Sequence, residues 1–284
     1  MFLARVRRDA GAPVEVVARD GDSDLLLPLV FGGPADPVGL LAQYGLAGLT
    51  AAVDRVRRTK TLRLDAESVI FEPPVATCTK ICCLALNYAD HAAESRLSVP
   101  PEPVLFFKPP SALTGHRRPV VAPARTRHLE HEVELAVVIG VPTRDLPAAR
   151  WREAVAGYTV INDVTARDLQ LTNMARNVPW DQAKGFDTFA PLGPYLATVD
   201  EVPDPQELEL RLEVDGKLRQ HANTRNMVFG IPRLIEDLSD GMTLLPGDVI
   251  ATGTVAGLAP LSEGDVMHAS VGGVGTLINQ VSFA

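Results

Sequence analysis

An apolar segment that begins with two glutamates constrains the fold of this chain more than any other stretch. Residues 131–140 carry Glu132 and Glu134 near their start, continue through β-branched and other apolar side chains, and end on Gly140, a pattern typical of a buried strand. Side chains two positions apart on a strand share a face, so the two carboxylates should lie together. Buried carboxylates without a partner are costly or take up a proton. The pair is therefore either held by a divalent metal ion or solvated at an exposed strand end, and this segment alone favours neither.

A second predicted strand supplies a third acid. The segment 158–162 is largely β-forming and runs into Asp163, which is a candidate oxygen ligand. A role as a helix N-cap is the competing interpretation of Asp163. Three carboxylates that leave positions open for water or substrate suit Mg²⁺ or Mn²⁺, because these hard ions prefer oxygen ligands.

Polar residues also follow the short apolar strand predicted at residues 81–86. If residues 89–95 form a helical turn, His91 and Glu94 stand on one face at positions i and i+3, where the carboxylate can orient the imidazole and raise its basicity. That arrangement is the outline of a general-base dyad. An incidental pair on a surface turn is the alternative, and it is the better interpretation of these residues taken alone.

Two further stretches bear on a site. Lys184 stands among aromatic residues and glycine and could reach an anionic substrate, although an exposed lysine is the default interpretation. The tract at residues 99–110 is rich in proline, which excludes a regular helix. It is predicted to be a loop that could move as a lid.

Charge and cysteine content narrow the function classes. The chain has 27 Lys and Arg against 35 Asp and Glu and a net charge of −8, which predicts small-molecule chemistry and no binding to nucleic acid. No apolar run approaches the ~20 residues of a membrane helix, and the first residues lack the apolar core of a signal peptide, so a cytoplasmic protein with no membrane partner is expected. Cys78, Cys82 and Cys83 lack a second pair to complete a zinc site and are predicted to be reduced core residues.

The prolines at positions 73 and 74 are the predicted boundary between a small N-terminal α/β unit and a larger second unit. In the first unit, apolar residues at helical spacing predict a helix over residues 49–56. Short strands are expected before it, near residues 2–6, 14–17 and 25–27.

The last third of the chain is dominated by structural signals. Alternation over residues 207–214, followed by Asp215-Gly216, predicts an antiparallel hairpin. A helix is expected over 232–238 and a strand over 249–251. The glycines at 272–275 are not followed by a helix and predict a hairpin turn, not a phosphate-binding loop.

Five motifs, taken in order, make the chain resemble the fumarylacetoacetate hydrolase family over residues 80–284, in particular its bacterial acylpyruvate and diketo-acid hydrolase branch. The resemblance implies an α+β, β-rich fold: a mixed β-sandwich roll with a small N-terminal α/β domain at 1–75 and the catalytic domain at 76–284. It also implies a homodimer. The motifs are Asn87–His91 with Glu94, Glu132–Leu135, Asn162–Asp168, Lys184–Asp187 and Thr252–Thr254.

The resemblance also assigns roles to residues. It implies a hydrolase that cleaves a C–C bond in an acylpyruvate or another 2,4-diketo acid, with His91 and Glu94 activating water and the metal stabilising the departing enolate. Its substrate is a small oxo acid, and one Mg²⁺ or Mn²⁺ is expected in each subunit. The implied metal ligands are Glu132, Glu134 and Asp163, the catalytic residues His91, Glu94 and Lys184, and the substrate-binding residues Tyr88, Gln170, Gly253 and Thr254.

Other reactions fit the same residues. A metal and enolate site could decarboxylate oxaloacetate or a related oxo acid without an attacking water, or isomerise a diketo acid. From a different class, the chain could be a non-catalytic metal-binding member that binds a partner, although the complete dyad and the three acids argue against this.

Two departures from the family pattern point to a different acyl end or an altered reaction. The loop after Thr254 is shorter than usual and leads quickly through Val255–Pro260 to Gly264-Asp265. His131 stands where an aromatic residue is more common, and on a regular strand it faces away from the two glutamates.

Overall fold

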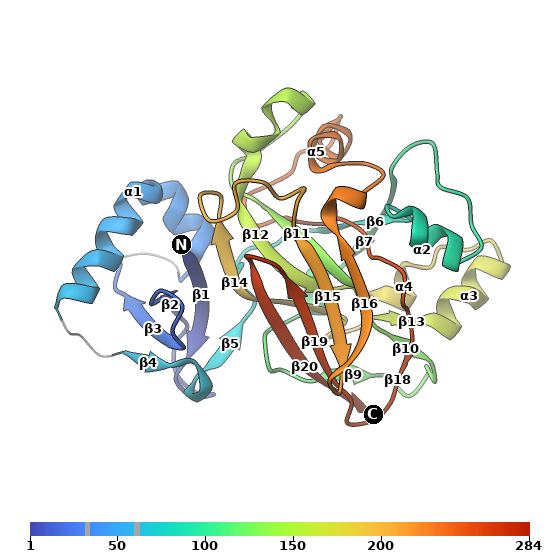
Figure 1. The fold of residues 1–284 in the computed structure, drawn as a ribbon, viewed down its shortest axis with the longest axis horizontal. Coiled ribbons are helices and arrows are strands. Elements are labelled where there is room, and N and C mark those ends of the chain that lie inside the picture. Colours follow the sequence, from blue (N-terminus) through green and yellow to red (C-terminus); the bar gives the residue numbers. More distant parts are fainter. Residues whose placement is uncertain (32–34, 60–62) are drawn as a thin grey trace.

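The computed structural model describes residues 1–31, 35–59 and 63–284 of the chain. Strands dominate it, and they form two large sheets with short helices around them (Figure 1). The predicted α+β, β-rich fold is therefore confirmed. Figure 1 also shows that the N-terminal strands and α1 lie at one end of the molecule, while α2 and α3 lie at the other.

The N-terminal segment is a meander of strands covered by helix α1 (Pro37–Arg58). This helix begins well before the predicted residues 49–56, because the Asp36 carboxylate caps it by accepting the Gly39 N–H at 3.1 Å. Gly45, with φ of 65°, kinks the helix. The strands are β1 Phe2–Arg7, β2 Glu15–Arg19, β3 Leu25–Leu29, β4 Leu64–Asp65 and β5 Ile70–Glu72.

These strands belong to the same large sheet as the central strands of the molecule. β1 pairs with β14, with Leu3 opposite Leu196, and the sheet order is β4-β3-β2-β1-β14-β12-β11-β17-β6-β7. The proposed boundary near residue 75 thus lies within one continuous sheet, and the division into two domains stays a prediction. The further strands of this sheet are β6 Ile81–Ala85, β7 Val104–Lys108, β8 Leu113–Thr114, β11 Val133–Ile139, β12 Val155–Asn162, β14 Ala190–Thr198 and β17 Val249–Ala251.

Strand β11 is buried along its whole length. Leu135 and Val137 pack into the core between the two large sheets, whereas Ala136 and Val138 pack into the core on the other face. Glu134 shares the face of Ala136 and Val138, as strand alternation predicts. The alternative of a solvated strand end is wrong, because Glu134 and the preceding Glu132 are both buried.

The second large sheet has the order β16-β15-β19-β20-β9 and packs against β11 and β12 through Leu210, Leu212 and Leu277. Both turns predicted here are confirmed. Asp215 and Gly216, with φ of 49° and 72°, join β15 to β16, and residues 272–274 join β19 to β20. The strands are β9 Val120–Ala122, β15 Glu209–Val214, β16 Lys217–Asn223, β19 Val266–Val271 and β20 Gly275–Phe283.

The proline-rich tract is not a continuous loop. Residues 104–108 form β7, which pairs antiparallel with β6 from Ala85 opposite Val104 to Ile81 opposite Lys108. The apolar run between the prolines has high strand propensity, and the prolines lie outside the paired residues, where they cost no ladder hydrogen bond. The prediction of a loop was therefore wrong for this part of the tract.

The remaining elements are short. Cys82 and Cys83 lie buried in β6 and Cys78 is partly buried, and all three are free thiols. No helix within the described ranges is long and apolar enough to cross a membrane. The helices are α2 Ala89–Glu94, α3 Arg167–Ala175, α4 Asp181–Lys184 and α5 Ile231–Ser239, with 3₁₀ helices at Ala66–Ser68, Pro110–Ala112, Ala148–Ala154 and Thr224–Asn226 and a small sheet of β10 Leu129–Glu130, β13 Thr165–Ala166 and β18 Pro260–Leu261.

Candidate active site and metal centre

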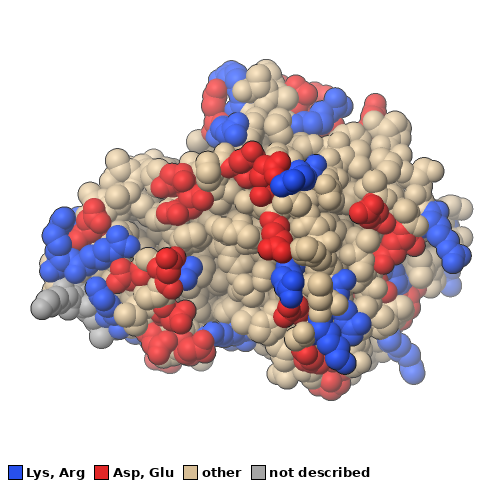
Figure 2. Space-filling model, viewed as in Figure 1, with Lys and Arg blue, Asp and Glu red and all other residues tan. Residues whose placement is uncertain are grey.

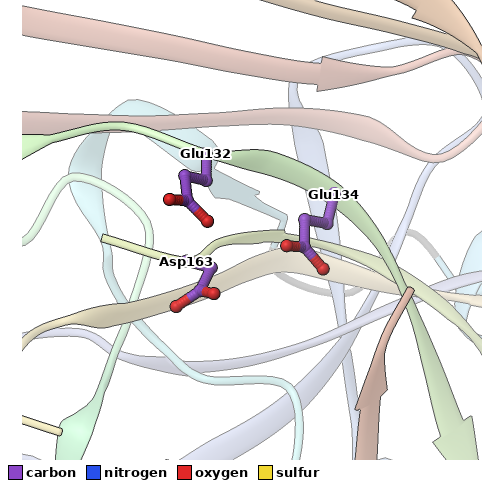
Figure 3. Close-up of side chains that lie close together, drawn as sticks. All are labelled: Glu132, Glu134 and Asp163. Carbon is purple, nitrogen blue, oxygen red and sulfur yellow. The ribbon is translucent and has the colours of Figure 1, made fainter. Parts of the chain in front are cut away.

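The structure brings Glu132, Glu134 and Asp163 together into one carboxylate cluster (Figure 3). One oxygen from each lies within 4.8 Å of the others, and all three side chains are buried. The backbone fixes this geometry, because the Asp163 N–H donates to the Glu132 carbonyl at 2.8 Å and the Glu132 N–H donates to Asn162 Oδ1 at 2.8 Å. The end of β12 is thereby fastened to the start of β11, and the three acids converge.

Glu134 lacks a cationic partner among the described residues. Its carboxylate accepts the Gly253 N–H at 2.7 Å. Burial, and then the Asp163 and Glu132 carboxylates, raise the pKa of Glu134 well above its ordinary value. Three converging carboxylates, one of them without a counter-charge, are the donor set that a hard divalent cation requires. The residues present therefore fit such an ion.

Lys184, the last residue of α4, is buried against this cluster. Its ammonium donates to Glu132 Oε2 at 2.8 Å, Asp163 Oδ2 at 2.6 Å and Thr165 Oγ1 at 2.9 Å. Burial acts to lower the pKa of Lys184, but Asp163 and Glu132 outweigh it and raise that pKa above its ordinary value. The default interpretation of an exposed lysine is wrong, and the side chain is a charged part of the site.

A second buried lysine was missed by the sequence analysis. Lys108, at the end of β7, pairs with Asp163 Oδ1 and donates to the Val164 carbonyl at 3.0 Å. It was hidden in the tract predicted to be a loop. The alternation of Val104, Phe106 and Lys108 was the available signal, because a lysine on the apolar face of a buried strand needs a carboxylate partner.

Arg167, at the start of α3, completes the set of charges. Its guanidinium donates to Glu130 Oε2 at 2.7 Å and Glu132 Oε1 at 2.6 Å, and it contacts the Gln170 amide oxygen. These charged groups comprise four carboxylates and three cations, so a divalent ion would change their net charge from −1 to +1. The carboxylates are Glu130, Glu132, Glu134 and Asp163, and the cations are Lys108, Arg167 and Lys184.

His91 and Glu94 share one face of α2, as predicted, but they are not hydrogen bonded. His91 Nδ1 lies 3.9 Å from Glu94 Oε2 and has no hydrogen-bond partner within the described residues. The Glu94 carboxylate instead accepts the Gly257 N–H at 3.0 Å and 3.2 Å. Burial is the main cause that lowers the pKa of His91, so the imidazole is neutral at neutral pH.

A cavity of about 520 Å³ borders part of the carboxylate cluster. Thr254 also lines it, and the Thr254 hydroxyl donates to the Val133 carbonyl at 3.0 Å and accepts from Gln220 at 3.0 Å. The predicted site residues that line the cavity are His91, Glu94, Glu132, Asp163, Gln170, Lys184 and Thr254.

Tyr88, Gly253 and the predicted metal ligand Glu134 are not among the lining residues. The Tyr88 hydroxyl is buried and has no hydrogen-bond partner in the described part of the chain. Gly253 holds Glu134 through its N–H, and a side chain there would meet Asn87 Cβ at 2.7 Å. Contact of Tyr88 and Gly253 with substrate stays a prediction, and Gly253 shapes the cluster through its hydrogen bond to Glu134.

Comparison with known proteins gives a consistent picture. Residues 80–282 match the family model described as fumarylacetoacetate (FAA) hydrolase C-terminal. An uncharacterized protein of Pyrococcus abyssi is 50% identical over 203 residues, which cover 72% of this chain and 90% of the relative.

Two solved structures resemble the whole chain, each with full coverage of both chains. The 5-carboxymethyl-2-hydroxymuconate delta-isomerase from Mycobacterium smegmatis is 36% identical with a TM-score of 0.80. The maleylpyruvate hydrolase from Sphingobium sp. SYK-6, in complex with manganese(II) ion and pyruvate, is 33% identical with a TM-score of 0.82.

Proposed function

Because the chain belongs to the fumarylacetoacetate hydrolase family, we propose that it is a divalent-metal-dependent hydrolase that cleaves a C–C bond in an acylpyruvate or a related 2,4-diketo acid. The observation that carries this proposal is that Glu132, Asp163, Lys184 and a neutral His91 line one cavity. Glu134 is buried beside the two carboxylates and completes the cluster. The similar maleylpyruvate hydrolase, with its manganese(II) and pyruvate, supports both the ion and the oxo-acid end of the substrate.

Glu132, Glu134 and Asp163 would hold the ion. When bound, Mg²⁺ or Mn²⁺ supplies positive charge that holds a 2-oxo acid and stabilises negative charge on its oxygens. Lys184 hydrogen bonds to Glu132 and Asp163 and also lines the cavity. Its ammonium therefore adds a second source of positive charge beside the substrate.

His91 is the general base in this proposal. Its neutral imidazole takes a proton from water as the water oxygen bonds to the carbonyl distant from the carboxylate. The C–C bond then breaks, its electron pair stays with the carbon that becomes the methyl group of pyruvate, and the proton is returned there. Glu94 is a positioning residue. Its carboxylate lies 3.9 Å from His91 Nδ1, so a shift of less than about 1 Å would form a hydrogen bond between them.

Isomerisation is a second candidate, favoured by the likeness to the delta-isomerase over the full chain. The same His91 would carry a proton from one carbon of the substrate to another, with no attacking water. Product analysis distinguishes the two reactions, because hydrolysis yields pyruvate and a second carboxylate whereas isomerisation conserves the mass of the substrate.

The proposal is tested with protein that has been stripped by chelator and reloaded with Mg²⁺ or Mn²⁺. Acetylpyruvate should yield acetate and pyruvate only in the reloaded samples. His91→Ala should abolish turnover while calorimetry still detects metal binding. Oxaloacetate serves as the decarboxylase control, and release of CO₂ from oxaloacetate without any hydrolysis of acylpyruvates would overturn the proposal.

Ion binding is tested without an activity readout. Glu134→Gln removes the buried charge that lacks a counter-ion, so this variant should be at least as stable as the wild type in chelator. It should lose most of the stabilisation that Mn²⁺ gives the wild type, which is about 2.7 kcal/mol in the free energy of unfolding at one hundred times Kd and is detected as a rise in Tm. An equal Mn²⁺-dependent rise in both proteins would remove Glu134 from the ligand set.

A further inference from the structure

We propose that the substrate carries one carboxylate, at the metal end, and an uncharged apolar acyl chain at the other end. This inference rests on the proposed function and names the class of substrate for that site. The observation behind it is the outer part of the cavity, which we call the acyl pocket. Its walls are formed by Leu86, Leu97, Val104, Leu171, Met174 and Trp180.

Helix α3 shows how the cavity changes from polar to apolar. Arg167, Gln170, Leu171 and Met174 all line it, and their spacing of i, i+3, i+4 and i+7 places them on one helix face. Arg167, in the first turn, bonds Glu132 in the carboxylate cluster. Leu171 and Met174, one to two turns further along, carry no polar group. The helix thus leads away from the metal cluster into an apolar region.

Strand β7 shows the same change from charged to apolar residues along its length. Val104, Phe106 and Lys108 alternate along one face of the strand. Lys108 ends at Asp163, whereas Val104 and Phe106 line the cavity. The Phe106 ring centroid lies 5.0 Å from Lys184 Nζ, and the ring meets the Trp180 ring edge-on with centroids 6.5 Å apart. Phe106 therefore marks where the charged part of the cavity ends.

No cation is free to receive a second carboxylate within the described lining. Lys184 and Arg167 are the cationic residues that line the cavity, and both are already paired with carboxylates of the cluster. Glu94 and Glu130 also line it and add negative charge. A carboxylate at the far end of a substrate would thus meet no unpaired cation among the described lining residues, and the acids would repel it.

An apolar acyl chain would bind in the acyl pocket more tightly than a charged one. Each methylene that leaves water for the acyl pocket contributes about 0.8 kcal/mol, which is roughly a fourfold gain in binding. Leu97 and Leu171 are 44% and 56% exposed in the free protein, so an acyl chain would cover apolar surface that now faces water. The expected substrates are acylpyruvates with straight or aromatic acyl groups.

The test compares hexanoylpyruvate with adipoylpyruvate, which differ only in a terminal methyl group against a terminal carboxylate. Acetylpyruvate, whose acyl group is too short to reach the acyl pocket walls fully, reports on the proposed function alone. The Mn²⁺-loaded wild type should show kcat/KM for hexanoylpyruvate at least about tenfold above that for adipoylpyruvate, because the terminal methyl group covers apolar surface whereas the terminal carboxylate is repelled by the acids. Pyruvate release and the second acid are both quantified.

A charge placed in the acyl pocket gives a second readout. Met174→Lys should raise the ratio of adipoylpyruvate to hexanoylpyruvate turnover at least about tenfold, because it supplies the missing cation. Ala175→Lys is the matched control, since Ala175 is exposed on the same helix and does not line the cavity; its ratio should equal that of the wild type.

The outcomes separate the two proposals. Hydrolysis of acetylpyruvate together with equal or faster hydrolysis of adipoylpyruvate would overturn the apolar acyl pocket and leave the hydrolase intact. No hydrolysis of any of the three compounds by the metal-loaded protein would overturn the hydrolase. An unchanged ratio in a folded Met174→Lys protein would show that the acyl end does not lie along α3.

Discussion

Asp163 is held from both sides by buried lysines. Lys108 pairs with its Oδ1 and Lys184 with its Oδ2, at 2.6 Å for the second pair. Two ammonium groups fix the orientation of the carboxylate plane and partly neutralise a cluster that would otherwise repel itself. Lys108 does not line the cavity, so it is a positioning residue that acts through Asp163.

Replacement of Lys108 with Met should lower the free energy of unfolding by about 3 kcal/mol, because breaking a buried ion pair leaves an uncompensated charge. Mn²⁺ should restore part of this loss, since the ion supplies the missing positive charge at Asp163. Urea unfolding with and without Mn²⁺ measures both effects. The exposed Lys217→Met is the control, and an equal loss in both variants would contradict the role given to Lys108.

The pH dependence of turnover should report on His91. Burial first, and then Arg167 and Lys184, lower its pKa below the ordinary 6.5, whereas Glu132 and Glu94 act to raise it. The base is active when neutral, so kcat/KM should fall only as the pH drops below 6.5. Glu94→Gln removes a group that raises the pKa and should move this acid limb to lower pH while reducing kcat. An acid limb at the same pH as in the wild type, or at a higher pH, would contradict the pairing of Glu94 with His91.

The side chains of the cluster were predictable to different degrees. Glu132 and Glu134 follow from strand alternation, which depends only on neighbouring residues. The burial of Lys184 depends on contacts with Asp163 and Glu132, far away in sequence, and local composition carries no sign of them. The 3.9 Å separation in the dyad depends on Gly257, whose N–H occupies the Glu94 carboxylate.

At the scale of elements, β5 and the loop before β9 approach each other unusually closely. An added Cβ on Gly115 would lie 2.1 Å from the Phe71 carbonyl oxygen. The backbone of β5 thus rests directly on this loop, and only glycine leaves room for that contact. The N-terminal segment is fastened to the rest of the chain at this point.

Gly115→Ala should therefore cost about 1–3 kcal/mol in the free energy of unfolding, because neither backbone can yield without shifting a strand. Gly272→Ala is the matched control, since its nearest contact is an ordinary 3.4 Å. Thermal unfolding of the two variants gives the comparison. If Gly115→Ala were as stable as Gly272→Ala, the close approach would not be a real constraint.

Prediction of helices and strands succeeded where the spacing of apolar residues is regular, and it failed where prolines or a capping residue determine the boundaries. The β15–β16 hairpin has clear alternation and a turn with two positive φ values, both of which are local signals. β7 was missed because prolines on both sides of it suggested a loop, although they lie outside its paired residues. The start of α1 was missed because its first turns have weak periodicity and are fixed by the Asp36 cap.

At the scale of the whole molecule, acidic and basic side chains are interspersed over the face shown in Figure 2. The negative total charge is therefore spread out on this face and does not form a single acidic surface. The buried titratable groups matter more for the response of stability to pH. His116 is one of them: its Nδ1 accepts the Ile278 N–H at 3.1 Å, and its ring meets the Phe71 ring edge-on with centroids 5.1 Å apart.

His116 should make the protein sensitive to acid. Burial, with smaller effects of Arg117 and His268, lowers its pKa to about 3. Between the ordinary value of 6.5 and this one, the unfolded chain binds a proton that the folded chain excludes. Stability from this group is therefore complete above 6.5 and is lost as the pH falls, by up to about 1.4 kcal/mol per pH unit.

His116→Asn keeps an acceptor for Ile278 and removes this titration. The free energy of unfolding of the variant should depend less steeply on pH between about pH 6 and pH 4 than that of the wild type. Urea unfolding at several pH values measures the slope. The exposed His221→Asn is the control for histidine removal, and parallel slopes in wild type and His116→Asn would contradict the assignment.

Part of the overall arrangement was accessible from sequence through ordered motifs. Residues 87–94, 132–134, 163 and 184 are separated along the chain, yet their order matched a known family. The structure places His91, Glu94, Glu132, Asp163 and Lys184 at one cavity, with Glu134 beside Glu132 and Asp163. The pairing of the N-terminal strands with the central sheet was not predicted, because β1 and β14 are far apart in sequence, with Leu3 opposite Leu196.

The pairing of β1 with β14 affects folding during synthesis, because β1 is made long before its partner. During synthesis, β1, β2, β3 and α1 emerge first, and their contacts with one another are local, so they can form early. The partner of β1 arrives only with Leu196 and its neighbours. β5 pairs with residues 5–7 of β1 as soon as it has emerged. Phe2 and Leu3, however, remain an open strand edge until β14 arrives, and this edge can pair with other nascent chains. Chaperone dependence should therefore be greatest while β14 is still inside the ribosome.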